Sequence, residues 1–381
     1  IPSVFVDSYE GMHSAIVHLI EVHGYRRLAF ISGPEGNFYA QERYRAYMDA
    51  LKAHGLSLDP NLVAPPVPWD ASTGMKSMRL LLDERQLRPQ VDFEAVVAAS
   101  DHLLLGVFEI LQERGIQVPG DVAAVGFDDI MQGRVSIPPF TTGVTSFYEV
   151  GHQAVETLLA LIEGAPVSGE TIVPSGLVIR QSCGCLGPAV ERAVVGPVEA
   201  SSETLESVLA SRRAEILSEM AQAVGESEKV AGGGVERLLD GFVSELQGGT
   251  PGLLMRELDG ALRQMTAAGG DLAAWQGAIS ALRRQVLPHL SGQALARAED
   301  LWQQARVAIA EMALRAQAQA QLQAVQQAQL LREIGAALIT TFDMDGLMTV
   351  LTDSLPRLGI PSCYISLYEN SQEPTEWSRL I

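Results

Sequence analysis

Hydrophobic residues in the first half of the chain follow two alternating spacings. Short apolar runs, which predict buried strands, occupy residues 2–7, 27–32, 95–100 and 123–127. Between them, apolar residues recur with helical spacing over residues 11–24, 40–55 and 102–115. These three helical segments end on Gly24, Gly55 and Gly115, residues that suit a left-handed C-terminal cap. The alternation predicts an α/β fold, with a parallel sheet covered by helices on both faces.

The second half of the chain has no strand pattern until its last residues. After the first domain, residues 1–187, a linker with several Gly and Pro residues spans 188–202. Residues 203–292 are rich in Ala, Leu, Glu, Gln and Arg and predict a helical bundle. Residues 293–342 contain no proline and only one glycine, so they predict a single helix of roughly 75 Å. Residues 343–381 begin a further domain.

One face of the predicted long helix carries a candidate coiled-coil seam. Its apolar residues Leu301, Ala305, Ala308 and Met312 fit positions a and d of successive heptads. Beyond Met312, repeated Ala and Gln blur the heptad pattern. We therefore expect a weakly specified coiled coil that joins two copies of the chain in a homodimer.

Charge and cysteine content narrow the function classes. The 381 residues include 27 basic and 46 acidic ones, for a net charge of −19. Such a chain repels phosphate backbones and anionic membranes, so we expect it to contact neither nucleic acid nor membrane. No apolar run reaches the about 18 residues of a membrane span. Three cysteines argue against a disulfide framework, and a cytoplasmic location is the resulting expectation.

Two adjacent acids, Asp128 and Asp129, follow the predicted strand 123–127 and are candidates for chemistry. A catalytic pair needs a carboxylic acid of raised pKa beside a leaving group, and no other motif supplies one. A divalent metal ion needs more oxygen ligands than the neighbouring sequence offers. The remaining interpretation is that one carboxylate accepts hydrogen bonds from a bound ligand.

The order and spacing of several segments indicate a family resemblance over residues 1–185. The segments are HLIEVHGYRRLAFISGP, AQERYRAYMDAL, PWDASTGM, DFEAVVAASDHLLLGVFEILQERGIQVPGDVAAVGFDDI, PPFTTGV and LVIRQSCG. Together they resemble the effector-binding domain of the lactose-repressor (LacI/GalR) family. The resemblance implies a periplasmic-binding-protein-like fold, in which two parallel-sheet lobes close over a small molecule. It also implies that most of the first lobe would precede residue 1, so we expect that lobe to be incomplete.

The resemblance implies ligand-binding roles for particular residues. Arg43 matches the family's arginine that forks onto ligand hydroxyls or carboxylates, and Trp69 matches an aromatic wall. Asp128 matches the family's ligand-gripping carboxylate, whereas Asp129 is expected to serve the turn or the packing of the lobes. Without the resemblance, Arg43 would be interpreted as a surface residue and Trp69 as a core residue.

Departures from the family pattern leave the identity of the ligand open. Ser100 precedes Asp101 where the family usually has Asn before Asp, so an amide donor is missing. Gly143 stands where Val is common, and Thr145 stands where Gln is frequent. The expected ligand-binding residues are Arg43, Trp69, Ser100, Asp101 and Asp128. These side chains suit a sugar, a polyol or a nucleoside-like effector.

The cysteines and histidines give no metal signature by their spacing. Cys183 and Cys185 lie two residues apart on a predicted strand and do not reproduce the paired CxxC spacing of zinc sites. The seven histidines are scattered, mostly on predicted helices. We therefore expect structural cysteines, surface or packing histidines, and neither a metal ion nor a cofactor.

The end of the chain resembles a second family. Residues 331–381 contain an incoming helix, an Asp-capped second helix and a strand, and this order is similar to the entry of a GAF domain. The resemblance implies the domain order of bacterial signalling proteins, in which a histidine kinase or cyclase output follows. The 381 residues themselves contain no kinase or cyclase motif.

Three functions from different classes fit these expectations. The first is the sensor region of a bacterial signalling protein, in which effector binding biases the bundle and the long helix. The alternative is a DNA-binding transcription regulator of the lactose-repressor family, with its helix-turn-helix upstream of residue 1. A secreted solute-binding protein is disfavoured by the predicted coiled coil and GAF-like segment. In each case we expect no catalytic residue in this chain.

Overall fold

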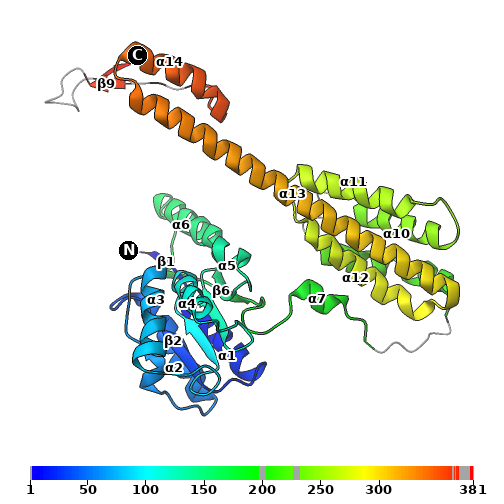
Figure 1. Ribbon diagram of the computed structural model, residues 1–381, viewed down its shortest axis with the longest axis horizontal. Helices are drawn as coiled ribbons and strands as arrows, with labels where there is room; N and C mark the ends of the chain where they lie inside the picture. Colours follow the sequence, from blue (N-terminus) through cyan, green and yellow to red (C-terminus); the bar gives the residue numbers. More distant parts are fainter. Residues whose placement is uncertain are drawn as a thin grey trace. The chain divides into compact units, whose positions relative to one another are not determined.

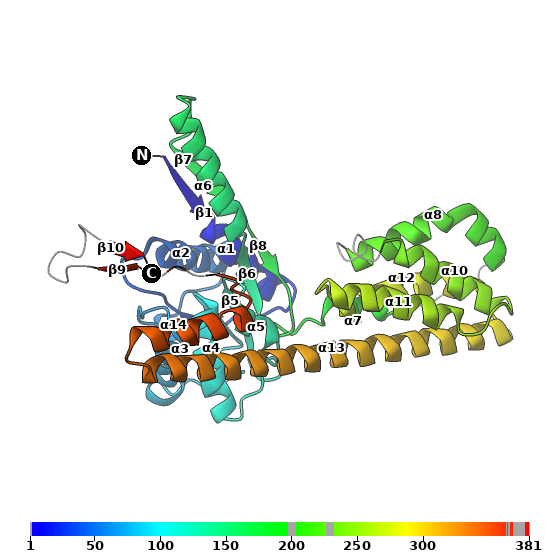
Figure 2. The same ribbon diagram turned by 90° about the horizontal axis from the view of Figure 1, so that it is seen from above.

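The computed structural model describes residues 2–196, 203–225, 232–362, 364, 366–368 and 378–380. The chain divides into two compact units, Ile1–Glu191 (unit 1) and Arg192–Ile381 (unit 2). Each unit has a hydrophobic core of its own. In Figures 1 and 2, unit 1 runs from blue to green and unit 2 from green to red.

Unit 1 is built on a six-stranded sheet with the order β3-β2-β4-β5-β6-β8. Its strands are β2 (Leu28–Ile31), β3 (Val63–Ala64), β4 (Ala95–Ala98), β5 (Ala123–Phe127), β6 (Thr141–Thr145) and β8 (Ser175–Val178). Neighbouring strands are parallel, except that β8 pairs antiparallel with β6. Every residue of β2, β4 and β5 is buried, which explains why these strands are continuous apolar runs.

Helices cover both faces of this sheet (Figures 1 and 2). They are α1 (Ser8–Glu21), α2 (Phe38–Ala53), α3 (Ala71–Arg79), α4 (Asp101–Glu113) and α5 (Met131–Val135), with a 3₁₀ turn at Pro60–Leu62 and a π-helical turn at Leu80–Glu84. α1 packs against α2, and α3 packs against α4. The side chains of Asp7, Asn37 and Ser100 cap α1, α2 and α4 by accepting a backbone N–H of the first turn.

Glycines meet two different requirements in unit 1. Gly24, Gly55 and Gly115 lie at φ +75°, +67° and +68°, which confirms the predicted left-handed turns after α1, α2 and α4. Gly106 instead permits close packing, because a Cβ there would lie 1.9 Å from the carbonyl oxygen of Ala71. The backbones of α3 and α4 therefore lie in direct contact.

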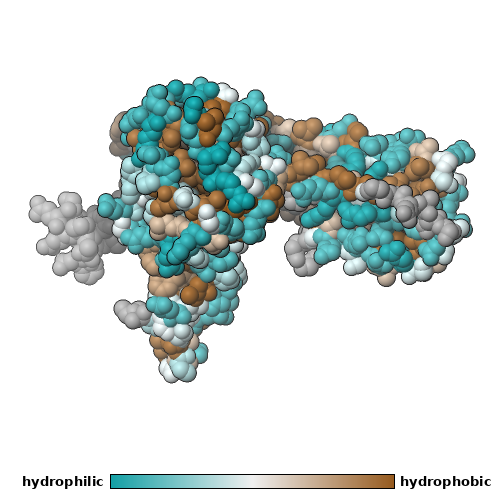
Figure 3. Space-filling model, turned by 90° about the horizontal axis from the view of Figure 1, so that it is seen from below, coloured by the Kyte–Doolittle hydropathy of each residue, from teal (hydrophilic) through white to brown (hydrophobic). Residues whose placement is uncertain are grey.

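A smaller part of unit 1 lies apart from the main sheet. β1 (Ser3–Val6) pairs in parallel with β7 (Glu170–Val173), and α6 (Phe147–Ile162) packs on this pair. α6 has no buried residue, and its apolar side chains Phe147 and Ile162 are 66 % and 73 % exposed. Apolar patches also interrupt the polar surface on the face drawn in Figure 3. Among the described residues, one face of α6 has no partner.

Unit 2 is helical up to its last segment. Its helices are α8 (Leu205–Val224), α10 (Gly234–Leu246), α11 (Leu253–Ala267), α12 (Trp275–Val286), α13 (Gly292–Thr340) and α14 (Met344–Ser354), with 3₁₀ turns at Leu272–Ala274, Leu287–His289 and Pro356–Leu358. In the expected linker, α7 (Pro188–Ala193) forms a short helix, and residues 197–202 lie outside the described residues. The finer domain boundaries remain predictions.

The first half of α13 belongs to the helical bundle. Leu301 and Ala305 are buried in the core that α13 forms with α10, α11 and α12 of the same chain. Next to them, Trp302 stacks on Phe242 with ring centroids 5.5 Å apart. The prediction that this seam pairs two chains is therefore wrong for Leu301 and Ala305. Apolar spacing indicates a buried helix face, but it does not say which chain covers that face.

The second half of α13 leaves the bundle, and residues 317–329 are all exposed. At its end, α13 packs against α14. Two short antiparallel strands follow, β9 (Ser366–Tyr368) and β10 (Ser378–Leu380). The predicted helix and strand of this segment are present, although Cys363 and residues 369–377 lie outside the described residues. Its identity as the start of a GAF domain stays a prediction.

Candidate functional site

A cavity of about 430 Å³ opens at the carboxyl ends of β4 and β5. It is lined by Val6, Ser8, Tyr39, Arg43, Trp69, Ser100, His102, Phe127, Asp128, Thr145, Phe147 and Val150. Parallel sheets bind their ligands at this edge, and the volume lies in the range of small-molecule sites. Four of the five expected ligand-binding residues line the cavity, although Arg43 and Asp128 are 85 residues apart in sequence.

Arg43 projects from α2 and is only 7 % exposed. Its Nη1 donates to the carbonyl oxygen of Ala99 at 2.7 Å, and its Nη2 donates to Oδ1 of Asp128 at 3.0 Å. Burial lowers the pKa of Arg43, and the Asp128 carboxylate opposes this shift. An arginine remains charged nonetheless, so the buried guanidinium needs this carboxylate as its counter-ion. The interpretation of Arg43 as a surface residue is excluded.

Two aromatic rings flank the Arg43 guanidinium. Its Cζ lies 3.8 Å from the ring centroid of Phe127 and 5.5 Å from that of Trp69, both within the range of a cation–π interaction. The Trp69 ring can pack against the backbone at Gly33 because this residue has no side chain. A Cβ at Gly33 would lie 2.2 Å from Cη2 of Trp69. The cavity thus combines a fixed cation with apolar ring faces.

The backbone after β5 points its two acids in different directions. Asp128 has φ +108° and Asp129 has φ +51°, a left-handed conformation that L-residues with side chains rarely adopt. Such strain persists where the surroundings hold it, and it is common at binding sites. Here ion pairs hold both residues, Asp128 with Arg43 and Asp129 with Arg180 at 2.7 Å. Burial raises the pKa of Asp128, whereas Arg43 acts to lower it.

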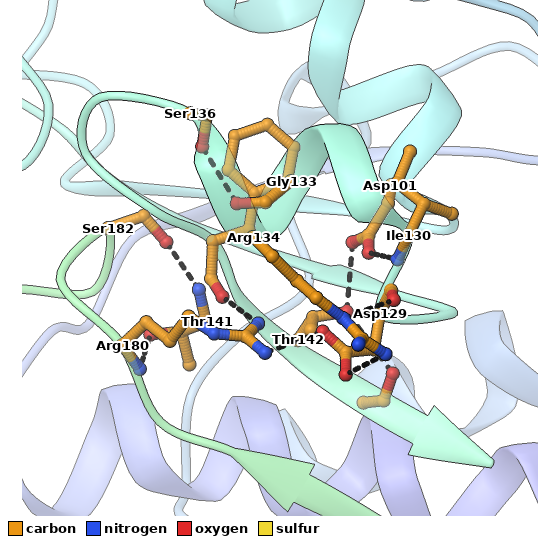
Figure 4. A network of polar contacts seen from close by, with 12 residues as sticks. Asp101, Asp129, Ile130, Gly133, Arg134, Ser136, Thr141, Thr142, Arg180 and Ser182 are labelled. Atoms are coloured by element: carbon orange, nitrogen blue, oxygen red, sulfur yellow. Dashed lines mark hydrogen bonds and ion pairs between the residues drawn. The ribbon is translucent and has the colours of Figure 1, made fainter. Parts of the chain in front are cut away.

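Asp129 has the structural role expected for it. Its carboxylate is 8 % exposed and pairs with Nη2 of Arg134 at 2.9 Å and with Nη2 of Arg180 at 2.7 Å (Figure 4). Arg180 also donates through Nη1 to the carbonyl oxygen of Phe140 at 2.8 Å. The acid therefore ties the turn after β5 to the segment after β8.

Asp101 lies beneath the cavity and does not line it. It is fully buried, with Oδ1 accepting from the Thr142 hydroxyl at 2.8 Å and Oδ2 accepting from the backbone N–H of Ile130 at 3.1 Å (Figure 4). Burial raises the pKa of Asp101 to about 7, against the effect of these hydrogen bonds. The structure thus separates Asp101 from the other expected ligand-binding residues and makes it a support of the Asp128 turn.

Ser100 lines the cavity, but its hydroxyl has a partner in the protein. It caps α4 by accepting the backbone N–H of Leu103 at 3.3 Å. Three other polar atoms of the cavity walls are buried and have no hydrogen-bond partner among the described residues: Nε of Arg43 and the hydroxyls of Ser8 and Thr145. A buried polar group without a partner costs about 1–3 kcal/mol, so a ligand that supplies the partner gains that amount.

Some residues of this cavity could not be found from their own positions in the sequence. Ser8 and Tyr39 belong to none of the segments that carry the family resemblance, and His102 follows the Ser100–Asp101 pair that was considered. Thr145 was noted only as a departure from the family pattern. The four residues come from different elements, and only the tertiary fold brings them together at the cavity.

A second hollow of about 410 Å³ lies beside α2. Its lining includes Tyr44, Val63, Ala64 and several prolines, with Glu35 as the charged residue among them. This surface lacks the buried cation and the buried unpartnered polar atoms of the first cavity. We therefore take the cavity around Arg43 as the candidate binding site.

The prediction that Cys183 and Cys185 lie on a strand is wrong: Cys183 lies in the turn after β8, and Cys185 directly follows this turn. The structure brings them together with His18 and His23, and their four donor atoms lie within 4.8 Å of one another. His18 and His23 are therefore neighbours in space, and whether they serve only in packing stays a prediction. The spacing gave no signal, because His18 and Cys183 are 165 residues apart.

Among the described residues, no helix is both long enough and apolar enough to cross a membrane.

Residues 16–183 match the family described as periplasmic binding protein-like domain. Over 183 residues, the chain is 33 % identical to the HTH-type transcriptional repressor CytR of Escherichia coli (strain K12), covering 48 % of this chain and 52 % of the relative. It is 36 % identical to the HTH-type transcriptional regulator CelR of Thermobifida fusca, covering 46 % and 48 %. A structure of a CelR–cellobiose complex aligns at 33 % identity, covering 48 % and 54 %, with a TM-score of 0.44.

These findings confirm the periplasmic-binding-protein-like domain and support the resemblance to the lactose-repressor family. The chain spans about half the length of the curated relatives it matches. Because these relatives are transcription regulators, they favour the alternative function over the signalling function. They give no support to the expectation that the protein makes no contact with nucleic acid.

Proposed function

We propose that this periplasmic-binding-protein-like domain binds a small polar effector and thereby sets the activity of a cytoplasmic transcription regulator. The observation that carries the proposal is the cavity around Arg43, where a buried ion pair, two ring faces and unpartnered polar atoms meet. The similarity of residues 16–183 to effector-binding regulators supports it.

The chemistry of the cavity favours a neutral, hydroxyl-rich ligand with a flat apolar face. Arg43 and Asp128 already compensate each other's charge, so a ligand with a net charge would disturb a balanced pair. The Trp69 and Phe127 rings offer packing surfaces, and the Ser8 and Thr145 hydroxyls can hydrogen-bond to ligand hydroxyls. Sugars, polyols and nucleosides share these properties.

Binding is tested by isothermal titration of the chain with glucose, cellobiose, sorbitol and adenosine as representatives of these classes. The sharpest variant is Thr145→Val, because the Thr145 hydroxyl has no partner in the described part of the chain, so its loss removes no hydrogen bond seen in the fold. We expect unchanged thermal stability and roughly 5- to 10-fold weaker binding of any ligand that binds the wild type. Binding that is unchanged in Thr145→Val would argue that the ligand sits elsewhere.

A second pair of variants tests the cation. Arg43→Met removes the buried guanidinium, whereas Arg45→Met removes an exposed one from the same helix and serves as the matched control. We expect Arg43→Met to lose effector binding and Arg45→Met to keep it. Circular dichroism of both variants separates a loss of binding from a loss of fold. Equal affinity in the two variants would exclude Arg43 from the site.

The regulatory output is tested on the full-length protein. If the domain controls transcription, an effector that binds the cavity changes the affinity for operator DNA, and Arg43→Met abolishes that change without abolishing DNA binding. If effector binding changes neither the affinity for DNA nor reporter transcription, the domain does not control transcription and the proposed output is wrong.

The exposed half of α13 favours a second candidate function, the relay of effector binding to a following output domain. Leu322, Val325 and Leu331 are between 47 % and 58 % exposed on this helix, which would suit pairing with a second copy. Light scattering is expected to give a dimer for the wild type and a monomer for Leu322→Asp. A monomeric wild type would remove the relay from consideration.

A further inference from the structure

Four metal-binding side chains meet at a place outside the candidate effector site. His18 lies in the last turn of α1, His23 in the loop that follows, and Cys183 and Cys185 in or directly after the turn behind β8. Their donor atoms all lie within 4.8 Å of one another. None of the four residues lines the cavity around Arg43.

Four of the six distances between the donor atoms fit a tetrahedron around one zinc ion, and all six lie within 4.8 Å. The two Nε2 atoms of His18 and His23 are 3.3 Å apart, and Sγ of Cys185 lies 3.4 Å from each of them. Sγ of Cys183 lies 3.5 Å from Nε2 of His18. With Zn–N of about 2.1 Å and Zn–S of about 2.3 Å, tetrahedral edges measure about 3.4 Å between nitrogens and about 3.6 Å between nitrogen and sulfur.

Hydrogen bonds alone do not account for this arrangement. Nε2 of His18 has three close neighbours, His23, Cys183 and Cys185, at 3.3 to 3.5 Å. An imidazole nitrogen carries either one hydrogen or one lone pair, so it can serve one of these contacts well. A cation at the centre serves all four donors at once.

The surrounding structure holds the four donors in place. His18 is 8 % exposed and Cys183 is fully buried, while His23 stacks on Tyr25 with ring centroids 5.5 Å apart. Gly184 lies at φ +109°, which lets the chain turn between the two cysteines, and a Cβ there would lie 3.3 Å from Cε1 of His23. The sequence Cys-Gly-Cys therefore allows both sulfurs to face the same point.

We propose that these four side chains bind one structural zinc ion, which ties the start of unit 1 to its end. Two imidazoles and two thiolates form a closed tetrahedral set, the kind that structural zinc sites use and that leaves no position open for a substrate. Each thiol gives its proton to solvent when the ion binds. The ion would close a loop of 165 residues between His18 and Cys183, and so stabilise unit 1 against unfolding.

The test starts from the chain purified under reducing conditions without a chelator or a metal-affinity resin. We expect elemental analysis by mass spectrometry to find one zinc ion per chain. Exchange of zinc for Co²⁺ is expected to give the intense visible bands of tetrahedral cobalt together with a thiolate-to-cobalt charge-transfer band. Removal of the metal with a strong chelator is expected to lower the melting temperature of unit 1, and added zinc sulfate to restore it.

Variants assign the metal to the four residues. Cys185→Ser and His23→Gln each remove one ligand at the half-buried side of the cluster, and His13→Gln on the same helix as His18 is the matched control. We expect both ligand variants to lose stoichiometric zinc and the charge-transfer band to weaken in Cys185→Ser, while His13→Gln retains full occupancy. If Cys185→Ser does not fold, His23→Gln and the chelated wild type carry the test.

Three results would overturn the proposal. The first is a wild-type chain that contains no zinc and neither binds added zinc or cobalt nor gains thermal stability from it. The second is metal binding that stays the same in Cys185→Ser and His23→Gln. A disulfide between Cys183 and Cys185 in the reduced preparation, seen as a mass lower by two hydrogens, would also contradict it.

Discussion

The buried carboxyl of Asp101 makes the stability of unit 1 depend on pH. Burial raises its pKa from 3.8 to about 7 in the folded chain, so folding favours the protonated form. The contribution of Asp101 to the free energy of unfolding is therefore complete below about pH 4 and is lost as the pH rises through 7. A pKa raised from 3.8 to about 7 corresponds to a loss on the order of 4 kcal/mol, of which roughly 2–3 kcal/mol falls between pH 5 and pH 8.

The substitution Asp101→Asn isolates this effect. An Asn can accept the backbone N–H of Ile130 and donate to the Thr142 hydroxyl, which can turn its own hydrogen to the Gly143 carbonyl oxygen at 3.1 Å. This is the hydrogen-bond pattern of the protonated acid, without a group that titrates. The stability difference between wild type and variant should therefore change with pH, while the effects of all other titrating groups cancel.

Urea unfolding followed by pulsed hydrogen exchange measures this difference, because peptides from unit 1 report on that unit alone. We expect the wild type to lose roughly 2–3 kcal/mol relative to Asp101→Asn between about pH 5 and pH 8. Effector affinity should stay unchanged, because Asp101 does not line the cavity. The reasoning fails if the difference is the same at both pH values. If Asp101→Asn weakens effector binding without changing the stability of unit 1, Asp101 is a ligand-binding residue.

Three further substitutions test the packing. Trp302→Ala removes a fully buried ring that stacks on Phe242, and it should destabilise unit 2 by about 3–5 kcal/mol in thermal unfolding. Gly106→Ala normally strengthens a helix, but here the added methyl group meets the α3 backbone, so urea unfolding should show a loss of about 1–3 kcal/mol. Arg180→Met leaves the buried Asp129 with a single ion-pair partner, and we expect a stability loss of about 2–3 kcal/mol in urea unfolding.

The strands and helices of unit 1 could be predicted because their signals are local. Runs such as Ala95–Ala98 are apolar throughout, and a glycine in a left-handed turn follows three of the helices. The pairing of β1 with β7 could not be predicted, because Ser3 and Glu170 become neighbours only through the tertiary fold. In unit 2, the burial of the first half of α13 within its own chain could not be predicted for the same reason, because it depends on the tertiary fold.

The parts of the candidate site that could be predicted are those for which the family resemblance implies a single role for a side chain. Arg43, Trp69 and Asp128 meet in the cavity as expected from the resemblance, and their roles there remain to be tested by binding. Asp101 could not be placed from sequence, since its position at the start of α4 is equally compatible with facing the cavity or the core. The cluster of His18, His23, Cys183 and Cys185 could not be predicted for a different reason. Neither the two histidines nor the two cysteines have the sequence spacing of a metal site.

The two halves of helix α13 differ in how much of the protein holds them. Its first half is packed in the core of unit 2. About 25 helical residues extend beyond that core, a length of roughly 37 Å. A tilt of about 5° at the base would carry the far end sideways by roughly 3 Å, close to the breadth of a side-chain contact. Mutations that loosen the bundle around Trp302 should therefore be felt most strongly at α14, far from the site of the change.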